Sequence, residues 1–151
     1  PEKPRGEAFL DELRALGADL SVVVAYGHIL PKAVIDLPPL GTLNIHASVL
    51  PKLRGADPIR AAIRQGFSET GVTIMRMVPA LDAGPIVHVR TTPIAVDETY
   101  GELWTRLSEL GAVALIEALA LLGAGAAEER AQDDAEATYA PKLARDDARL
   151  D

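Results

Sequence analysis

The sequence predicts an α/β domain in which a mainly parallel, Rossmann-like sheet is flanked by helices and includes one antiparallel strand pair. Three observations support this class. Segments with strand character alternate with segments whose apolar residues recur at helical spacing. The first strand, SVVVA, is apolar on both faces, as in a central parallel strand covered by helices. Two later strands are separated only by the turn LDAGP, and so short a connection indicates an antiparallel pair.

The first third of the chain reads as helix, strand, short helix and strand. Residues 7–16 have apolar side chains at helical spacing and end before Gly17, a residue suited to a helix C-terminus. The strand SVVVA follows at 21–25. A short helix is expected over 32–35, because the two prolines that follow it stop a helix. The second strand is TLNIHAS, residues 42–48.

A third helix and two strands follow. Asp57 is placed to cap a helix N-terminus, with Pro58 at the first helical position of PIRAAIRQG. The segments GVTIMRMV and PIVHVRTTPI alternate strongly enough to be strands, and they form the antiparallel pair.

The longest helix begins at a capping box made by Thr99 and Glu102 and runs to Gly123, with a weak point at Gly111. Trp104 lies beside apolar positions of this helix and is expected in the core.

The tail after the long helix is polar and acidic. It reads as a loop, a short segment over 139–143 and then a linker. We therefore expect residues 1–135 to form one domain and residues 136–151 to begin a linker.

Composition limits the functions open to this chain. With 151 residues, 48% of them apolar, the chain is long enough for one domain with a real core. The absence of cysteine excludes disulfides, thiolate metal sites and a cysteine nucleophile, and it fits a cytoplasmic location. A net charge of -7 opposes a broad nucleic-acid-binding face.

Because Glu117 interrupts the richest apolar stretch, that stretch reads as a buried helix, and no membrane partner is expected. His28 and His88 lack metal spacing to a third ligand and read as surface or packing residues.

A polar pair marks the end of the second strand. Asn44 and His46 are two residues apart, so they project from the same face, while Ile45 turns into the core. Such a pair alone is ordinary surface chemistry. Asp82, in the turn between the last two strands, is likewise an ordinary turn residue unless it faces the pair.

Several ordered motifs carry a family resemblance. NIHASVLPKLRGADPI followed by ETGVTIMRMVPALDAGPI resembles the folate-dependent formyltransferases, whose signature is an Asn, a His two residues later and a distant Asp in an LDxG turn. VVVAYGHILPKAV and TYAPKLARDDARLD resemble segments of the members that formylate methionyl-tRNA. The similarity covers nearly the whole chain, although Leu53, Asp57 and Pro85 depart from the usual pattern in the substrate loops.

The resemblance implies a donor, an acceptor and a set of site residues. The donor is 10-formyltetrahydrofolate, the acceptor is the amino group of methionyl-tRNA, and no metal is involved. The catalytic residues are Asn44, His46 and Asp82. The implied cofactor-binding residues are Ile29, Leu30, Ile45, Leu81 and Gly84, the first two lining an apolar slot for the pterin. The implied substrate-binding residues are Ser48 and Arg54, although Arg54 also reads as a solvated loop charge.

Formyl transfer is acyl transfer, which needs donors for an oxyanion and a route for a proton. Asn44 and an N–H of His46 suit the oxyanion, while Asp82 suits orienting the ring and holding a relay water. These residues leave other acceptors open, namely glycinamide ribonucleotide or an amino-sugar nucleotide. They also leave open hydrolysis of the formyl group and a non-catalytic folate-binding module. The resemblance further implies a βαβ segment before Pro1 and a tRNA-binding barrel after Asp151.

Overall fold

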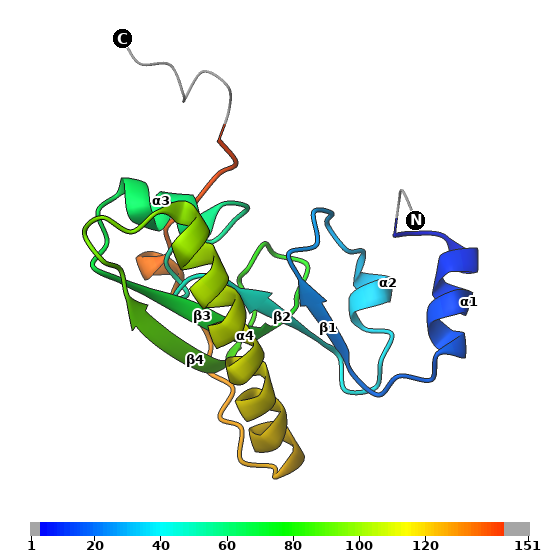
Figure 1. The fold of residues 1–151 in the computed structure, drawn as a ribbon. Coiled ribbons are helices and arrows are strands. Elements are labelled where there is room, and N and C mark those ends of the chain that lie inside the picture. The colour runs from blue at the N-terminus through cyan, green and yellow to red at the C-terminus, as the bar shows by residue number, and fades with distance from the viewer. Residues whose placement is uncertain (1–3, 144–151) are drawn as a thin grey trace.

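The computed structural model describes residues 4–143 and contains a four-stranded sheet in the order β1-β2-β3-β4 (Figure 1). The strands are β1 (Ser21–Val24), β2 (Thr42–His46), β3 (Glu69–Arg76) and β4 (Ile86–Pro93). β1 and β2 are parallel, whereas β2 with β3 and β3 with β4 are antiparallel. The α/β class and the predicted antiparallel pair are confirmed.

The sheet is mixed, so its parallel part is smaller than the sequence pattern indicated. The cause is the connection from β2 to β3. His46, the last residue of β2, pairs with Thr73, so β3 begins beyond the carboxyl end of β2 and runs back alongside it. A parallel neighbour would have required the chain to cross back over the sheet before starting β3.

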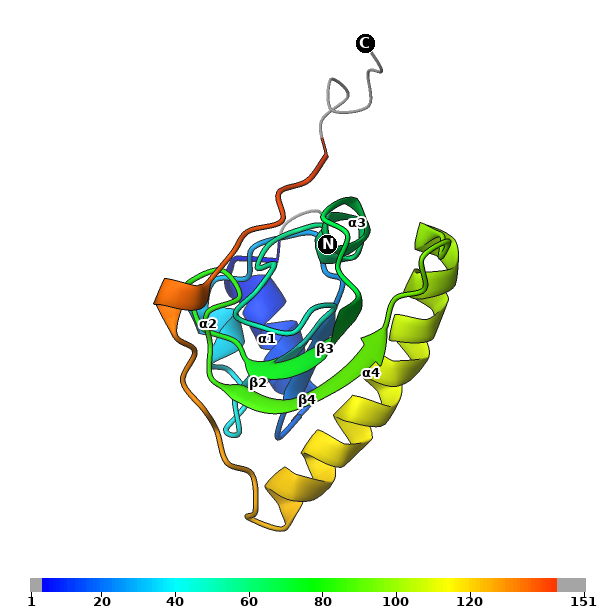
Figure 2. The ribbon, with the colours of Figure 1, turned by 90° about the vertical axis from the view of Figure 1, so that its left-hand side faces the viewer.

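Helices cover both faces of the sheet. They are α1 (Glu7–Ala15), α2 (Lys32–Ile35), α3 (Pro58–Arg64), α4 (Tyr100–Gly123) and the short 3-10 helix η1 (Asp134–Glu136). Helix α4 packs on β3 and β4, and α1 and α2 lie on the opposite side of the sheet (Figure 2). All four predicted α-helices are confirmed. Over residues 4–143, none of the helices combines the length and apolar character needed to cross a membrane.

The main core lies between α4 and the sheet, and a smaller one joins α1 and α2 to the loop after β1. Gly111 faces β2 from α4, where an added Cβ would lie 3.2 Å from the Ile45 side chain. The helix passes through Gly111 without a break, so this glycine allows close packing rather than marking the predicted weak point.

Among the described strands, β1 lies at the sheet edge and pairs with β2, and Val22 and Val24 are exposed. One further prediction is corrected by packing. Asp57 occupies the N-cap position of α3 without capping it. Its carboxylate instead accepts a hydrogen bond from Arg60 Nη1 at 2.9 Å.

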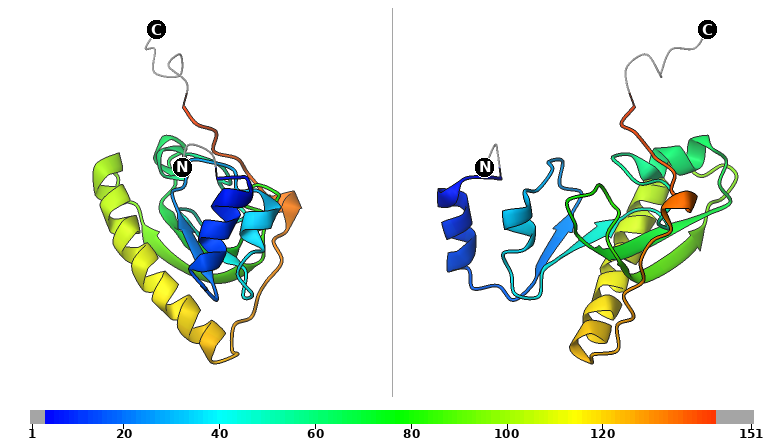
Figure 3. Two further views of the ribbon diagram at one scale, coloured as in Figure 1. Left: turned by 90° about the vertical axis from the view of Figure 1, so that its right-hand side faces the viewer. Right: turned by 180° about the vertical axis from the view of Figure 1, so that it is seen from behind.

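The C-terminal tail returns to the domain after α4 (Figure 3). The main-chain N–H of Arg54 donates to the Thr138 carbonyl at 2.8 Å, and that of Ala140 donates to the Arg54 carbonyl at 2.7 Å. Ala140 is buried, and Gly55 has a positive φ of 112° where its α-carbon packs against the Ala140 carbonyl. The domain boundary at residue 135 stays a prediction, yet residues 138–140 pack with the residues before it.

The capping box of α4 is confirmed and supplies a test of stability. The Thr99 hydroxyl accepts from the Glu102 N–H, and the Glu102 carboxylate accepts from the hydroxyl and the N–H of Thr99. We expect Thr99→Ala to lower the free energy of unfolding by about 1 kcal/mol in denaturant titrations at pH 7, the usual cost of losing such a cap. Thr105→Ala, on an exposed interior turn of the same helix, is the matched control and is expected to leave stability unchanged or higher.

The same box sets the sign of a pH effect. Hydrogen bonds from the Thr99 hydroxyl, and then from its N–H, lower the pKa of Glu102 below its ordinary value of 4.5. A lowered folded-state pKa contributes stability above pH 4.5 that is lost as the pH falls further. The difference in the free energy of unfolding between wild type and Thr99→Ala should therefore shrink on acidification. Equal free energies of unfolding at pH 7 would contradict a stabilising capping box.

Candidate active site

Three predicted residues converge at the carboxyl end of β2. Asn44 and His46 project from one face of that strand, and Asp82 comes from the turn between β3 and β4. All three line one cleft of about 800 Å³. The predicted convergence is therefore confirmed.

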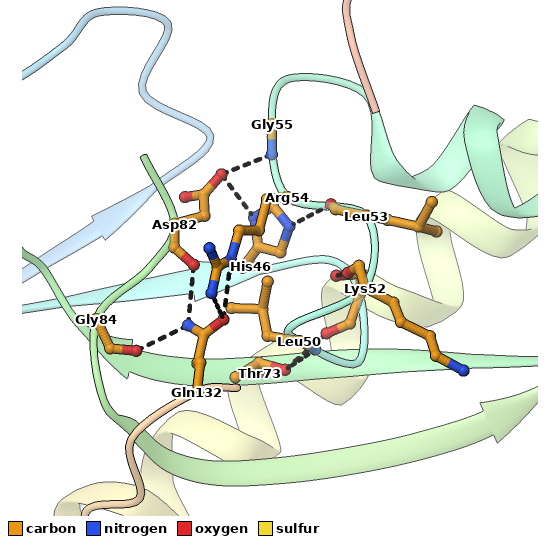
Figure 4. A network of polar contacts seen from close by, with 11 residues as sticks. His46, Leu50, Lys52, Leu53, Arg54, Gly55, Thr73, Asp82, Gly84 and Gln132 are labelled. Atoms are coloured by element: carbon orange, nitrogen blue, oxygen red, sulfur yellow. Dashed lines mark hydrogen bonds and ion pairs between the residues drawn. The ribbon is translucent and has the colours of Figure 1, made fainter. Parts of the chain in front are cut away.

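The two ring nitrogens of His46 face different partners (Figure 4). Nε2 lies 2.9 Å from the Leu53 carbonyl oxygen, and Nδ1 lies 3.7 Å from Oδ2 of Asp82. A carbonyl oxygen can only accept, so Nε2 carries the hydrogen of the neutral ring and Nδ1 carries the lone pair. His46 can thus take up a proton at Nδ1, beside the Asp82 carboxylate. Nδ1 can donate a hydrogen bond to an oxyanion only after it has taken up a proton. The predicted role of a His46 N–H as an oxyanion donor is therefore limited to the protonated ring.

Asp82 is held in an uncommon backbone conformation. Its φ of 48° is in the left-handed region, which non-glycine residues rarely adopt. Its Oδ2 accepts a hydrogen bond of 2.8 Å from the main-chain N–H of Gly55. The carboxylate is therefore fixed between that N–H and the His46 ring, as expected of a group with a defined role rather than a freely rotating turn side chain.

The two predicted substrate-binding residues are buried and engaged, which corrects that assignment. The Ser48 hydroxyl is fully buried and donates to the Lys52 carbonyl at 2.6 Å. Arg54 is 3% exposed, and its guanidinium bonds to Gln132 and Asp134. The Ser48 hydroxyl is engaged by neighbouring backbone, and Nε and Nη2 of Arg54 are engaged by Gln132 and Asp134 of the C-terminal tail, so both side chains serve the structure of the loop.

Four of the five predicted cofactor-binding residues line the cleft. Ile29 is 86% exposed and Leu81 is also exposed, whereas Leu30 and Ile45 contribute to the apolar cores as well. Gly84 is the exception and is a correction. Its carbonyl accepts from Gln132, and its α-carbon packs so closely on the Arg76 carbonyl that an added Cβ would lie 1.8 Å from that oxygen. Gly84 therefore shapes the turn and is not among the residues that line the cleft.

Trp104 was expected in the core, but it is 52% exposed and lines the cleft. Leu103 and Leu107 occupy the side of α4 that faces the sheet, and a neighbouring residue on a helix points about 100° away. Of the other two histidines, His28 is exposed and lines the same cleft, and Nε2 of His88 pairs with the Glu117 carboxylate at 2.8 Å. Within residues 4–143, no three His, Asp or Glu side chains are placed together to hold a metal ion.

Sequence reasoning did not identify Gln132, the Gly55 N–H or the Leu53 carbonyl. Main-chain groups carry no residue-type signal, and a single amide in a polar tail has no distinctive spacing. Only the adjoining segment TYAPK, which belongs to the family resemblance, marks this part of the tail as more than a linker.

A histidine paired with a carboxylate, beside an amide in a cleft at a strand end, is typical of sites for acyl and proton transfer. The chain belongs to the formyl transferase family, whose sequence model matches residues 1–119. Methionyl-tRNA formyltransferase of Pseudomonas fluorescens (strain SBW25) is 56% identical over 93% of this chain and 44% of its own length. The enzyme of the same name from Stutzerimonas stutzeri (strain A1501) is 53% identical over 100% of this chain and 48% of its own.

Solved structures show the same fold. Glycinamide ribonucleotide transformylase 1 from Symbiobacterium toebii aligns with a TM-score of 0.74 and 27% identity, over 83% of this chain and 62% of that one. HypX from Aquifex aeolicus in complex with tetrahydrofolic acid aligns with a TM-score of 0.83 and 23% identity, over 94% of this chain and 24% of that one. The chain spans about half the length of the curated relatives it matches.

Proposed function

We propose that this chain carries the formyl-transfer site of an enzyme that moves a formyl group from 10-formyltetrahydrofolate to the amino group of methionyl-tRNA. The observation that carries the proposal is the convergence of Asn44, His46 and Asp82 in one cleft. Family membership supports formyl transfer, and the names of the relatives at 56% and 53% identity support methionyl-tRNA as the acceptor.

Each of the three residues has a distinct task in this proposal. The acceptor nitrogen attacks the formyl carbon, a C–N bond forms, and the carbonyl oxygen becomes an oxyanion. The Asn44 amide donates to that oxygen. His46 Nδ1, with its lone pair in the cleft, receives the proton from the attacking nitrogen, and the Asp82 carboxylate stabilises the positive ring. The proton then passes to the folate nitrogen as its bond to the formyl carbon breaks, so that no covalent enzyme intermediate is needed.

The cleft has the character that a folate donor requires. Ile29 and Leu30 offer apolar surface for the pterin, and the main chain at Leu81 offers polar groups at its edge. The structural neighbour in complex with tetrahydrofolic acid lends further support to a folate donor. No metal is part of the proposal, because oxyanion donors and proton carriers supply the chemistry described above.

Two features concern how the acceptor tRNA would be bound: the packing of the C-terminal tail, and the length of this chain compared with its relatives. Residues 138–140 pack against the loop that contains Gly55, so we place the end of the catalytic unit after Ala140 rather than at residue 135. The relatives are about twice as long, and in this proposal most contacts to tRNA lie in their remaining half. A cytoplasmic location goes with the proposal, because aminoacylated tRNA is found there.

A direct assay separates the candidate acceptors. The full-length protein is incubated with labelled 10-formyltetrahydrofolate and, in parallel, with methionyl-tRNA, glycinamide ribonucleotide, an amino-sugar nucleotide or no acceptor. Transfer of label to methionyl-tRNA alone is the expected result. Transfer only to another acceptor, or release of formate without one, would replace this proposal with the corresponding alternative. Folate binding without any turnover would favour a binding module.

A further inference from the structure

Gln132 links the C-terminal tail to the turn that carries Asp82 (Figure 4). Its side-chain nitrogen donates to the main-chain carbonyls of Asp82, at 2.9 Å, and Gly84, at 2.8 Å. Its side-chain oxygen accepts from Nε of Arg54, at 3.1 Å, and from Nη2, at 2.8 Å. Both N–H bonds and the oxygen are thus in use, and only one orientation of the amide satisfies all four contacts.

The Arg54 side of this network is rigid. Its guanidinium is almost fully buried, and its main chain is paired on both sides with Thr138 and Ala140. The other partner of the guanidinium, Asp134, has a side chain that is 82% exposed. A solvent-screened pair of this kind contributes little to holding a group in place. Gln132 therefore connects the Asp82 turn to a fixed point of the domain.

The turn itself needs such support. Asp82 has a positive φ, which aspartate adopts more readily than most residues but which is still less favourable than the ordinary right-handed region, so contacts that hold the turn stabilise it. Its main-chain carbonyl is one of the two that Gln132 holds, and its carboxylate lies 3.7 Å from His46 Nδ1. Because backbone and carboxylate belong to the same residue, a rotation of the Asp82 peptide would move the carboxylate away from the ring.

We propose that Gln132 is a positioning residue for the reaction. It acts through Asp82, by holding the turn so that the carboxylate stays against His46 and the Gly55 N–H. The inference rests on the formyl-transfer role proposed above, and it gives the tail a part in catalysis that its polar, linker-like sequence does not suggest.

The first test compares two partners of Arg54 in the full-length protein. Gln132→Glu keeps the size of the side chain and an acceptor for Arg54, but it removes both donated hydrogen bonds to the turn. We expect kcat for methionyl-tRNA formylation to fall about 10- to 100-fold, with KM values little changed, as is typical when a reacting group is misplaced. Asp134→Asn, the control, weakens the Arg54 contact alone and is expected to keep kcat within about twofold. Equal losses in the two variants would overturn the inference.

A double-mutant cycle separates positioning from a merely structural role. If Gln132 acts through Asp82, then adding Gln132→Glu to Asp82→Asn lowers kcat by less than about twofold further, because the group it positions is already lost. Losses that multiply would show an independent effect and overturn the inference. Gln132→Met, which has a similar length and no hydrogen bonds, must give the same pattern and replaces Gln132→Glu if the latter does not fold.

A readout that does not need turnover keeps the inference separate from the proposed function. The Gly55 N–H is the donor to the Asp82 carboxylate, so its hydrogen exchange reports on that contact. Faster exchange in Gln132→Glu but not in Asp134→Asn is expected. Unchanged exchange would overturn the positioning role even if the enzyme is active. A wild-type protein that forms no formylmethionyl-tRNA would instead refute the proposed function while leaving this measurement informative.

Discussion

Asp82→Asn is expected to lower kcat for formyl transfer by about a hundredfold or more, the usual size of losing a positioned acid-base group, while folate affinity changes little. The carboxylate lies 3.7 Å from His46 Nδ1, the nitrogen that takes up the proton in the proposed reaction. Its charge matters most when the ring becomes positive, as the tetrahedral intermediate forms and collapses. The loss should therefore appear in kcat rather than in binding.

Asparagine is a close control for shape at this position. Its side-chain oxygen can still accept the hydrogen bond from the Gly55 N–H, so the turn is expected to keep its conformation. The measurement is steady-state kinetics of the full-length protein and its variant, together with a direct folate titration. A near-normal rate, or a defect confined to folate affinity, would mean that Asp82 is a turn residue without a catalytic role.

The sequence predicted the parts of this site that follow from local periodicity. The two-residue spacing of Asn44 and His46 on a strand places both side chains on one face, whatever the rest of the fold does. The position of Asp82 needed more, because an aspartate in a turn is common. Here the family resemblance supplied the third member, and the structure brings it to the cleft.

Local periodicity could not predict which side chains are buried by contacts with segments far away in the sequence. Arg54 sits in a loop beside the active strand and looks like a free charge in the sequence. It is buried because Gln132 and Thr138, about 80 positions later, pack onto it. Trp104 shows the opposite error. An aromatic residue on an amphipathic helix usually points inward, yet the sheet below α4 is already filled by Leu103 and Leu107.

The direction of β3 relative to β2 could not be predicted for a related reason. A run of valines indicates a strand that is apolar on both faces, but it does not say which neighbours are present. Among the described strands, β1 pairs only with β2, and two of its valines face outward. The direction of β3 depends on where the connection through α3 returns, which hydrophobic periodicity does not encode.

Asn44→Ala is expected to reduce kcat about a hundredfold, or about 3 kcal/mol, the usual cost of removing one preorganised oxyanion donor. The amide is half-buried at the end of β2 and lines the cleft. Nε2 of His46 is occupied by the Leu53 carbonyl, so the neutral ring offers no N–H to a developing oxyanion. Of the Asn44 and His46 pair, the amide of Asn44 is then the side chain that can donate at the start of the reaction, and its removal should affect the chemical step more than KM.

Asn44→Asp distinguishes a donor from a residue that merely fills space. Aspartate has nearly the shape of asparagine, but it cannot donate when ionised and brings a negative charge towards the oxyanion. If Asn44 is an oxyanion donor, Asn44→Asp should be slower than Asn44→Ala, because electrostatic repulsion adds to the lost hydrogen bond. If its role is packing, the larger Asp variant should be the faster of the two. Single-turnover rates at saturating folate, with thermal melts to confirm that both variants fold, measure this order directly.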